Sequence, residues 1–148
     1  MLQHKVVNLN DENISINLNN VLVESLEKRD ALTFELNDGG EYQLTQSELW
    51  TAFNVLSSDE FDILTDYINR REDAFQEASA LYANMVKDGN FDANTLYDYG
   101  HAMKAYGRFG ALADNLKGRL IELVGWSGWV DACRMYESLT KVPREWLS

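Results

Sequence analysis

The chain has 148 residues, of which 45% are hydrophobic and one is proline. This length suits a single domain, and the apolar fraction excludes a chain that is disordered throughout. Thirteen Lys and Arg oppose 24 Asp and Glu, so the net charge of −11 disfavours nucleic acid and anionic lipid as partners and favours a basic protein.

The compartment is predicted from cysteine content and hydropathy. Cys133 is the only cysteine, so an internal disulfide is excluded. No segment approaches the roughly 18 apolar residues of a membrane span, and Met1–Lys5 is not followed by the apolar run of a secretory signal. We therefore expect a cytoplasmic protein that does not contact membranes.

Residues 1–45 are predicted to be β-rich. Apolar and polar residues alternate over Ile14–Leu18 and again over Leu32–Leu36, which is the period of a half-buried strand. Asp38–Gly40 tolerates positive φ, so Leu32–Leu36 and Glu41–Leu44 are predicted to form a β-hairpin.

The segment before this hairpin has two interpretations. Val21–Leu26 is interpreted as a further strand, with Glu27–Asp30 as the turn that follows it. The alternative is that Glu27–Asp30 ends a short helix. A small sheet of this kind would be marginal alone, so we expect it to pack on helices.

Residues 46–148 are predicted to be helical, with three recognisable helix starts. Thr45 and Glu48 have the spacing of a capping box, and Ser57 and Glu60 repeat it. Asp92 has the chemistry to cap a third helix.

Two heptad seams, meaning apolar residues at alternating steps of three and four, follow the second and third starts. Lys87–Asn90 can turn the chain between them, which predicts an antiparallel hairpin with arms of roughly 35–40 Å. The alternative pairs one arm with a second chain, which leaves a homodimer open. The first seam comprises Phe61, Leu64, Ile68, Arg71, Phe75, Ala78, Tyr82 and Met85, and the second comprises Tyr99, Ala102, Tyr106, Phe109, Ala113, Leu116, Leu120 and Leu123.

Three glycines, Gly100, Gly107 and Gly110, lie beside the second seam. Each costs about 1 kcal/mol relative to alanine inside a helix. We therefore expect either a helix break near Gly107–Gly110 or another backbone packed closely there, most simply the sheet or the final helix.

The C-terminal part is predicted to begin with a break at Gly125–Trp129. A final helix is expected from Ser127 to about Leu139, before Pro143. Three tryptophans are interpreted as core anchors, with an exposed binding hot spot as the alternative. They are Trp126, Trp129 and Trp146.

Candidate catalytic and metal-binding residues are few. Asp98 and His101 share a helix face but lack further ligands, and Cys133 falls on an apolar face as an inert thiol. Gly107–Gly110 matches the bare G-x-x-G of a nucleic-acid-clamping loop, but a heptad seam runs through it. We expect no enzyme, no metal, no cofactor and no direct contact with nucleic acid.

The candidate partner-binding site is a line of five carboxylates opposite the first seam. They are Asp59, Asp62, Asp66, Asp73 and Glu77. Fixed negative charges on a rod resemble the phosphates that a DNA-binding groove attracts. The hypothesis is a non-enzymatic acidic module that binds a basic protein, in the manner of phage-encoded inhibitors that mimic nucleic acid; the alternative is a structural or oligomerising subunit that uses the seams and tryptophans.

The predicted fold class is α+β and mostly α. Residues 1–148 are expected to form one domain, in which a small N-terminal antiparallel sheet packs on a helical bundle. The bundle is expected to be built around the long antiparallel hairpin.

Overall fold

The computed structural model describes residues 6–7, 12–89 and 91–147. The chain is mostly helical with a small antiparallel sheet, which confirms the coarse prediction. The elements are α1 (Glu12–Lys28), β1 (Leu32–Glu35), β2 (Glu41–Leu44), α2 (Gln46–Leu56), α3 (Asp59–Asp88), α4 (Ala93–Thr140) and the 3-10 helix η1 (Arg144–Leu147).

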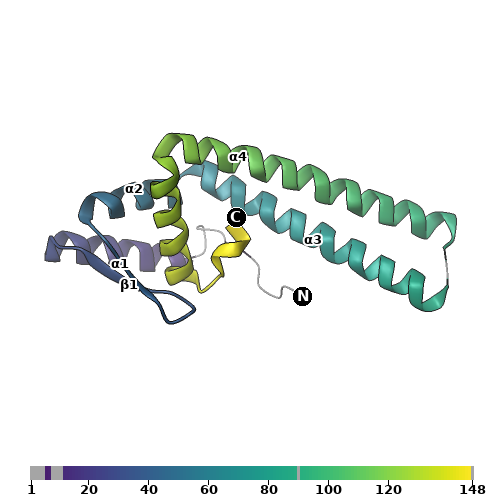
Figure 1. The fold of residues 1–148 in the computed structure, drawn as a ribbon, viewed down its shortest axis with the longest axis horizontal. Coiled ribbons are helices and arrows are strands. Elements are labelled where there is room, and N and C mark those ends of the chain that lie inside the picture. Colours follow the sequence, from purple (N-terminus) through teal and green to yellow (C-terminus); the bar gives the residue numbers. More distant parts are fainter. Residues whose placement is uncertain (1–5, 8–11, 90, 148) are drawn as a thin grey trace.

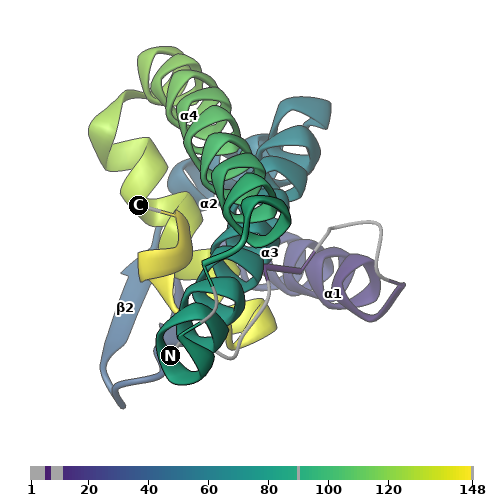
Figure 2. The same cartoon turned by 90° about the vertical axis from the view of Figure 1, so that its right-hand side faces the viewer.

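These elements divide into a body and a projection (Figure 1). α1, the sheet, α2, η1 and the last part of α4 gather at one end of the molecule. α3 and the first part of α4 lie side by side and run outward from that end, and Figure 2 looks along them from their tip. We call the outer part of this pair, residues 73–88 and 93–111, the arm.

The first helix corrects the sequence prediction. The strands predicted at Ile14–Leu18 and Val21–Leu26 are wrong, because both segments lie in α1. Ile14, Leu18 and Ser25 are buried at helical spacing, whereas Ile16 is 49% exposed. Ile14 and Leu18 are four residues apart, a spacing that fits both one face of a helix and the alternation of a strand. The β-rich N-terminal part is therefore reduced to one hairpin.

That hairpin is where the sequence placed it. β1 pairs antiparallel with β2 in a register that sets Leu32 opposite Leu44 and Phe34 opposite Tyr42. Gly39 has φ 83° in the connecting turn, a backbone conformation that glycine adopts without strain. The first strand ends at Glu35, one residue earlier than predicted.

Helix caps agree with the sequence at two of three starts. The Thr45 N–H donates to Glu48 Oε1 at 2.9 Å and the Glu48 N–H donates to Thr45 Oγ1 at 3.3 Å, so the predicted capping box forms. The Asp92 carboxylate likewise accepts from the Thr95 N–H at 2.7 Å. The prediction for Ser57 is wrong: Ser58 caps α3, because Ser57 still ends α2.

The main core lies where α2, the base of α3 and the final part of α4 meet. Leu49, Leu56, Phe61 and Tyr136 are fully buried there. Trp129 and Trp146 are buried as predicted, but Trp126 is 67% exposed, so its assignment to the core is wrong.

The glycines of α4 do not behave as predicted. α4 continues through Gly107 and Gly110 without a break. A Cβ added at Gly100 or Gly107 would meet no other described atom within 4 Å, apart from the helix's own turns. The expected packing of the sheet or the final helix against these two glycines is therefore wrong.

The predicted break at Gly125–Trp129 is instead a single sharp bend at Gly125. Its φ of 78° and ψ of 165° interrupt the otherwise helical backbone of α4 and turn the final part back onto the body. Only glycine occupies this region without strain of about 1–3 kcal/mol. We expect Gly125→Ala to lower the free energy of unfolding by about 2 kcal/mol in urea denaturation.

Gly118→Ala is the matched control for this bend. Gly118 lies in the same helix with helical φ, and its added Cβ would meet no described atom within 4 Å outside that helix's own turns. Alanine there should raise the free energy of unfolding by up to about 1 kcal/mol. Equal effects of the two substitutions would show that the bend does not depend on glycine.

Candidate functional site

The five predicted carboxylates all lie on α3. Asp59, Asp66, Asp73 and Glu77 are exposed, whereas Asp62 is half-buried near the body. The helix rise places Asp59 and Glu77 about 27 Å apart. We call these five residues the acidic row.

Asp66 of the acidic row forms an ion pair within the chain. Asp66 Oδ2 accepts from Arg70 Nε at 3.0 Å, one helical turn away. Both side chains are more than half exposed, so this ion pair contributes only a few tenths of a kcal/mol and opens at little cost. The Arg70 guanidinium also lies 5.6 Å from the centre of the Phe109 ring. The four exposed members of the row, Asp59, Asp66, Asp73 and Glu77, are therefore all accessible to a partner.

The arm carries a groove on a different side. Phe75, Ser79 and Tyr82 of α3 line one wall and Tyr99, Met103 and Tyr106 of α4 the other, around about 320 Å³. Two ring pairs cross it: Phe75 with Tyr106 at 5.7 Å between centroids, and Tyr82 with Tyr99 at 6.2 Å. Asp73 and Tyr82 are nine residues apart, which at about 100° per residue places them on opposite sides of α3.

The sequence assigned most of these groove residues to the heptad seams. In the arm, however, Ala74, Ala78 and Met85 are buried, whereas Phe75 and Tyr82 are exposed. Ala78 and Met85 belong to the predicted seam, so in the arm only half of that seam is buried, and Phe75 and Tyr82 lie beside the helix contact. Residues at the core end of the seam, such as Phe61 and Leu64, are buried as expected.

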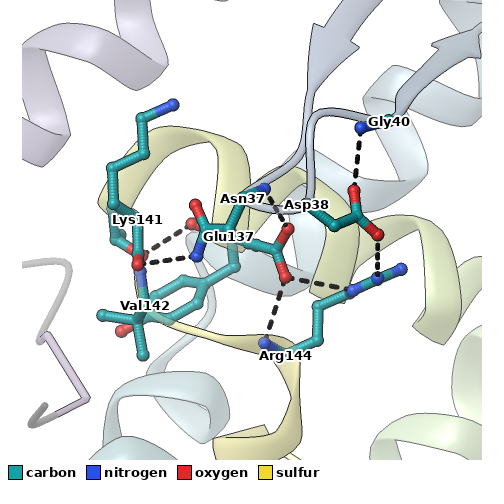
Figure 3. A network of polar contacts seen from close by, with 9 residues as sticks. Asn37, Asp38, Gly40, Glu137, Lys141, Val142 and Arg144 are labelled. Carbon is teal, nitrogen blue, oxygen red and sulfur yellow. Dashed lines mark hydrogen bonds and ion pairs between the residues drawn. The ribbon is translucent and has the colours of Figure 1, made fainter.

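A buried polar network joins the body's distant segments (Figure 3). Glu137, 3% exposed, accepts from the Asn37 N–H at 2.8 Å and from the Arg144 N–H and Nε at 3.2 and 3.1 Å. Asn37 Nδ2 donates to the Lys141 carbonyl at 2.9 Å, and Asp38 Oδ2 lies 3.9 Å from the guanidinium. Because both Glu137 oxygens are engaged by protein groups, the network serves to hold the hairpin turn against the C-terminal segment.

The remaining chemical candidates are inert or dispersed. Cys133 is 8% exposed, and burial raises the pKa of its thiol to about 12, so it stays protonated near neutral pH. The His101 ring packs against Tyr97 at 4.4 Å between ring centroids. Gly107–Gly110 lies inside α4 and so does not form the loop between two helices that a G-x-x-G clamp requires.

The described residues contain neither a metal-binding cluster nor a membrane-spanning helix. No three His, Cys, Asp or Glu side chains there gather closely enough to hold a metal ion. None of the helices in the described part of the chain is long and apolar enough to cross a membrane.

Comparison with protein-family models, with curated proteins and with solved structures finds no match to this chain. Two surfaces on opposite sides of α3 stand out: the acidic row and the aromatic groove of the arm.

Proposed function

We propose that this chain is a non-enzymatic module that binds a basic protein through the acidic row. The observation that carries the proposal is the exposure of Asp59, Asp66, Asp73 and Glu77 along one side of a 30-residue helix. That helix packs on α4, so the carboxylates keep their spacing without a partner. A preformed array of this kind loses little conformational entropy on binding.

The charge of the whole chain supports the same partner chemistry. A net charge of −11 attracts cationic surfaces from a distance and speeds the encounter. Regularly spaced anions on a rod offer a nucleic-acid-binding protein what a phosphate backbone offers it. We therefore propose a nucleic-acid-binding protein as the partner class and competitive inhibition as the effect.

The test replaces three row members by their amides. Asp59→Asn, Asp73→Asn and Glu77→Gln are combined, and binding to a labelled oligo-arginine peptide is measured by fluorescence anisotropy at low ionic strength. Exposed charge pairs contribute about 0.2–1 kcal/mol each, so the triple variant should bind about tenfold more weakly. The wild-type affinity should fall steeply as salt is raised.

The control variant has the same change in net charge, but at positions outside the acidic row. Glu27→Gln, Asp30→Asn and Glu122→Gln alter three exposed carboxylates outside the row. This variant should lose less than about twofold in affinity if the row is the site. Equal weakening of the two triple variants would mean that the peptide senses only overall charge, and the proposed site would be wrong.

A further inference from the structure

The side of the arm that carries the groove has the composition of a protein interface. Six large apolar side chains there are between 38% and 57% exposed: Phe75, Tyr82, Val86, Leu96, Met103 and Tyr106. Together with Ser79, Ala83, Tyr99, Gly100, Gly107 and Gly110, we call them the aromatic face; none of these residues is charged. Aromatic and Met enrichment with depletion of charge is the signature of an interface core.

Two glycines of this face, Gly100 and Gly107, face open space, whereas Gly110 packs against the Arg71 side chain. Gly100 and Gly107 each cost about 1 kcal/mol of helix stability, and no other described atom outside α4 approaches their missing side chains. Their absent side chains leave a shallow stripe along α4. No described part of this chain packs into the stripe, so a helix that approached α4 closely there would belong to another molecule.

The bulky and the small residues of the face repeat at one spacing. Phe75 and Tyr82, Tyr99 and Tyr106, and Gly100 and Gly107 are each seven residues apart, which is about 10.5 Å along a helix. In a two-fold symmetric dimer the same surface of each copy packs on the other. The large side chains of one copy must therefore be spaced like the small residues of the other copy that receive them. The aromatic face provides both.

The available area of the aromatic face fits a second arm. Side chains of this size present about 150–250 Å² when fully exposed, so six that are roughly half exposed offer on the order of 500 Å² per copy. Two copies then bury about 1,000 Å², near the threshold of a specific interface.

We infer that the aromatic face docks a second copy of this chain, so that two arms form a four-helix bundle. The aromatic side chains of one arm lie over the glycine stripe of the other. The acidic row, on the opposite side of α3, stays outside this bundle. The inference does not depend on the proposed binding of a basic protein.

The test is the oligomeric state of the full chain by sedimentation velocity over a wide range of protein concentration. The wild type should reach a dimer, and Gly107→Leu should weaken it by about tenfold, because a side chain in the stripe blocks close approach. Leucine has a higher helix propensity than glycine and its Cβ meets no described atom outside α4, so the monomer should stay folded, as circular dichroism would verify. Tyr82→Glu, which places a charge on the face, should have the same effect.

Ala80→Leu is the matched control, because Ala80 is exposed on another side of the arm. It should leave the dimer unchanged.

Added salt should strengthen the dimer by screening the repulsion between two chains of net charge −11, whereas it weakens binding of the basic peptide. A wild type that stays monomeric at high salt and concentration, or a Gly107→Leu chain that dimerises like the wild type, would overturn the inference. Oligo-arginine binding by Gly107→Leu separates the two proposals, since that variant leaves the acidic row intact.

Discussion

Replacing Glu137 by alanine is expected to lower the free energy of unfolding by about 3 kcal/mol. The substitution leaves the Asn37 N–H, the Arg144 N–H and the Arg144 guanidinium without the acceptor that they share. Breaking a buried ion pair by removing one partner costs about 3–5 kcal/mol. The lower end applies here because the Arg144 side chain is 33% exposed and can regain water. Urea denaturation gives the change from the midpoint and the slope.

Two further variants define what the network contributes. Glu137→Gln keeps one acceptor oxygen, so a loss of about 1–2 kcal/mol is expected. Glu145→Gln changes an exposed carboxyl in η1 and should alter stability by less than about 0.5 kcal/mol. If Glu137→Ala cost no more than the change at Glu145, the network would not be what fixes the hairpin turn to the C-terminal segment.

Helix caps and the hairpin turn were predictable from the sequence, because each depends on residues only a few positions apart. The capping box at Thr45 and the cap at Asp92 were correct, because the donor and acceptor lie three residues apart along the chain. The hairpin turn was correct because Gly39 supplies the positive φ it needs. At Ser57 and Ser58 two identical cap residues are adjacent, and local chemistry does not choose between them.

The helix α1 and the Glu137 network were not predictable in the same way, because both depend on contacts between residues far apart in the sequence. α1 contains several asparagines, which favour turns, and it is helical because Ile14, Leu18 and Val21 pack toward the core. Propensity is a weak guide when an amphipathic face has a core to join. The Glu137 network joins residues 100 apart in sequence, and no local pattern marks such a pair.

The two candidate surfaces differ in how much the sequence revealed. Charge and helical period were enough to propose the acidic row, and the Asp66–Arg70 pair was readable from its four-residue spacing. The aromatic face was not recognised, because the same heptad pattern describes a buried seam and an exposed one. Phe61 is buried because Tyr136 of the final part of α4 packs on it, whereas Phe75 lies out on the arm and is exposed.

One aromatic pair lies in the core at the base of α3. Phe61 and Tyr136 are both fully buried, with ring centroids 5.4 Å apart in an edge-to-face arrangement. The Tyr136 hydroxyl donates to the Val7 carbonyl and accepts from the Val7 N–H at 2.6 Å. Asn69 Nδ2 donates to the Val6 carbonyl at 2.9 Å. The pair therefore links α3, the final part of α4 and the N-terminal segment.

Phe61→Ala is expected to lower the free energy of unfolding by about 4 kcal/mol, because it removes a fully buried ring and leaves a cavity. Tyr136→Phe should cost about 2 kcal/mol, since it keeps the ring and removes only the hydroxyl that satisfies both polar groups of Val7. Phe91→Ala is the matched control, as that ring is 56% exposed at the arm tip and its loss should cost under about 1 kcal/mol. Similar losses for Phe61→Ala and Phe91→Ala in urea denaturation would contradict the placement of the core at the base of α3. A Tyr136→Phe variant as stable as the wild type would show that the N-terminal segment is held without this hydroxyl.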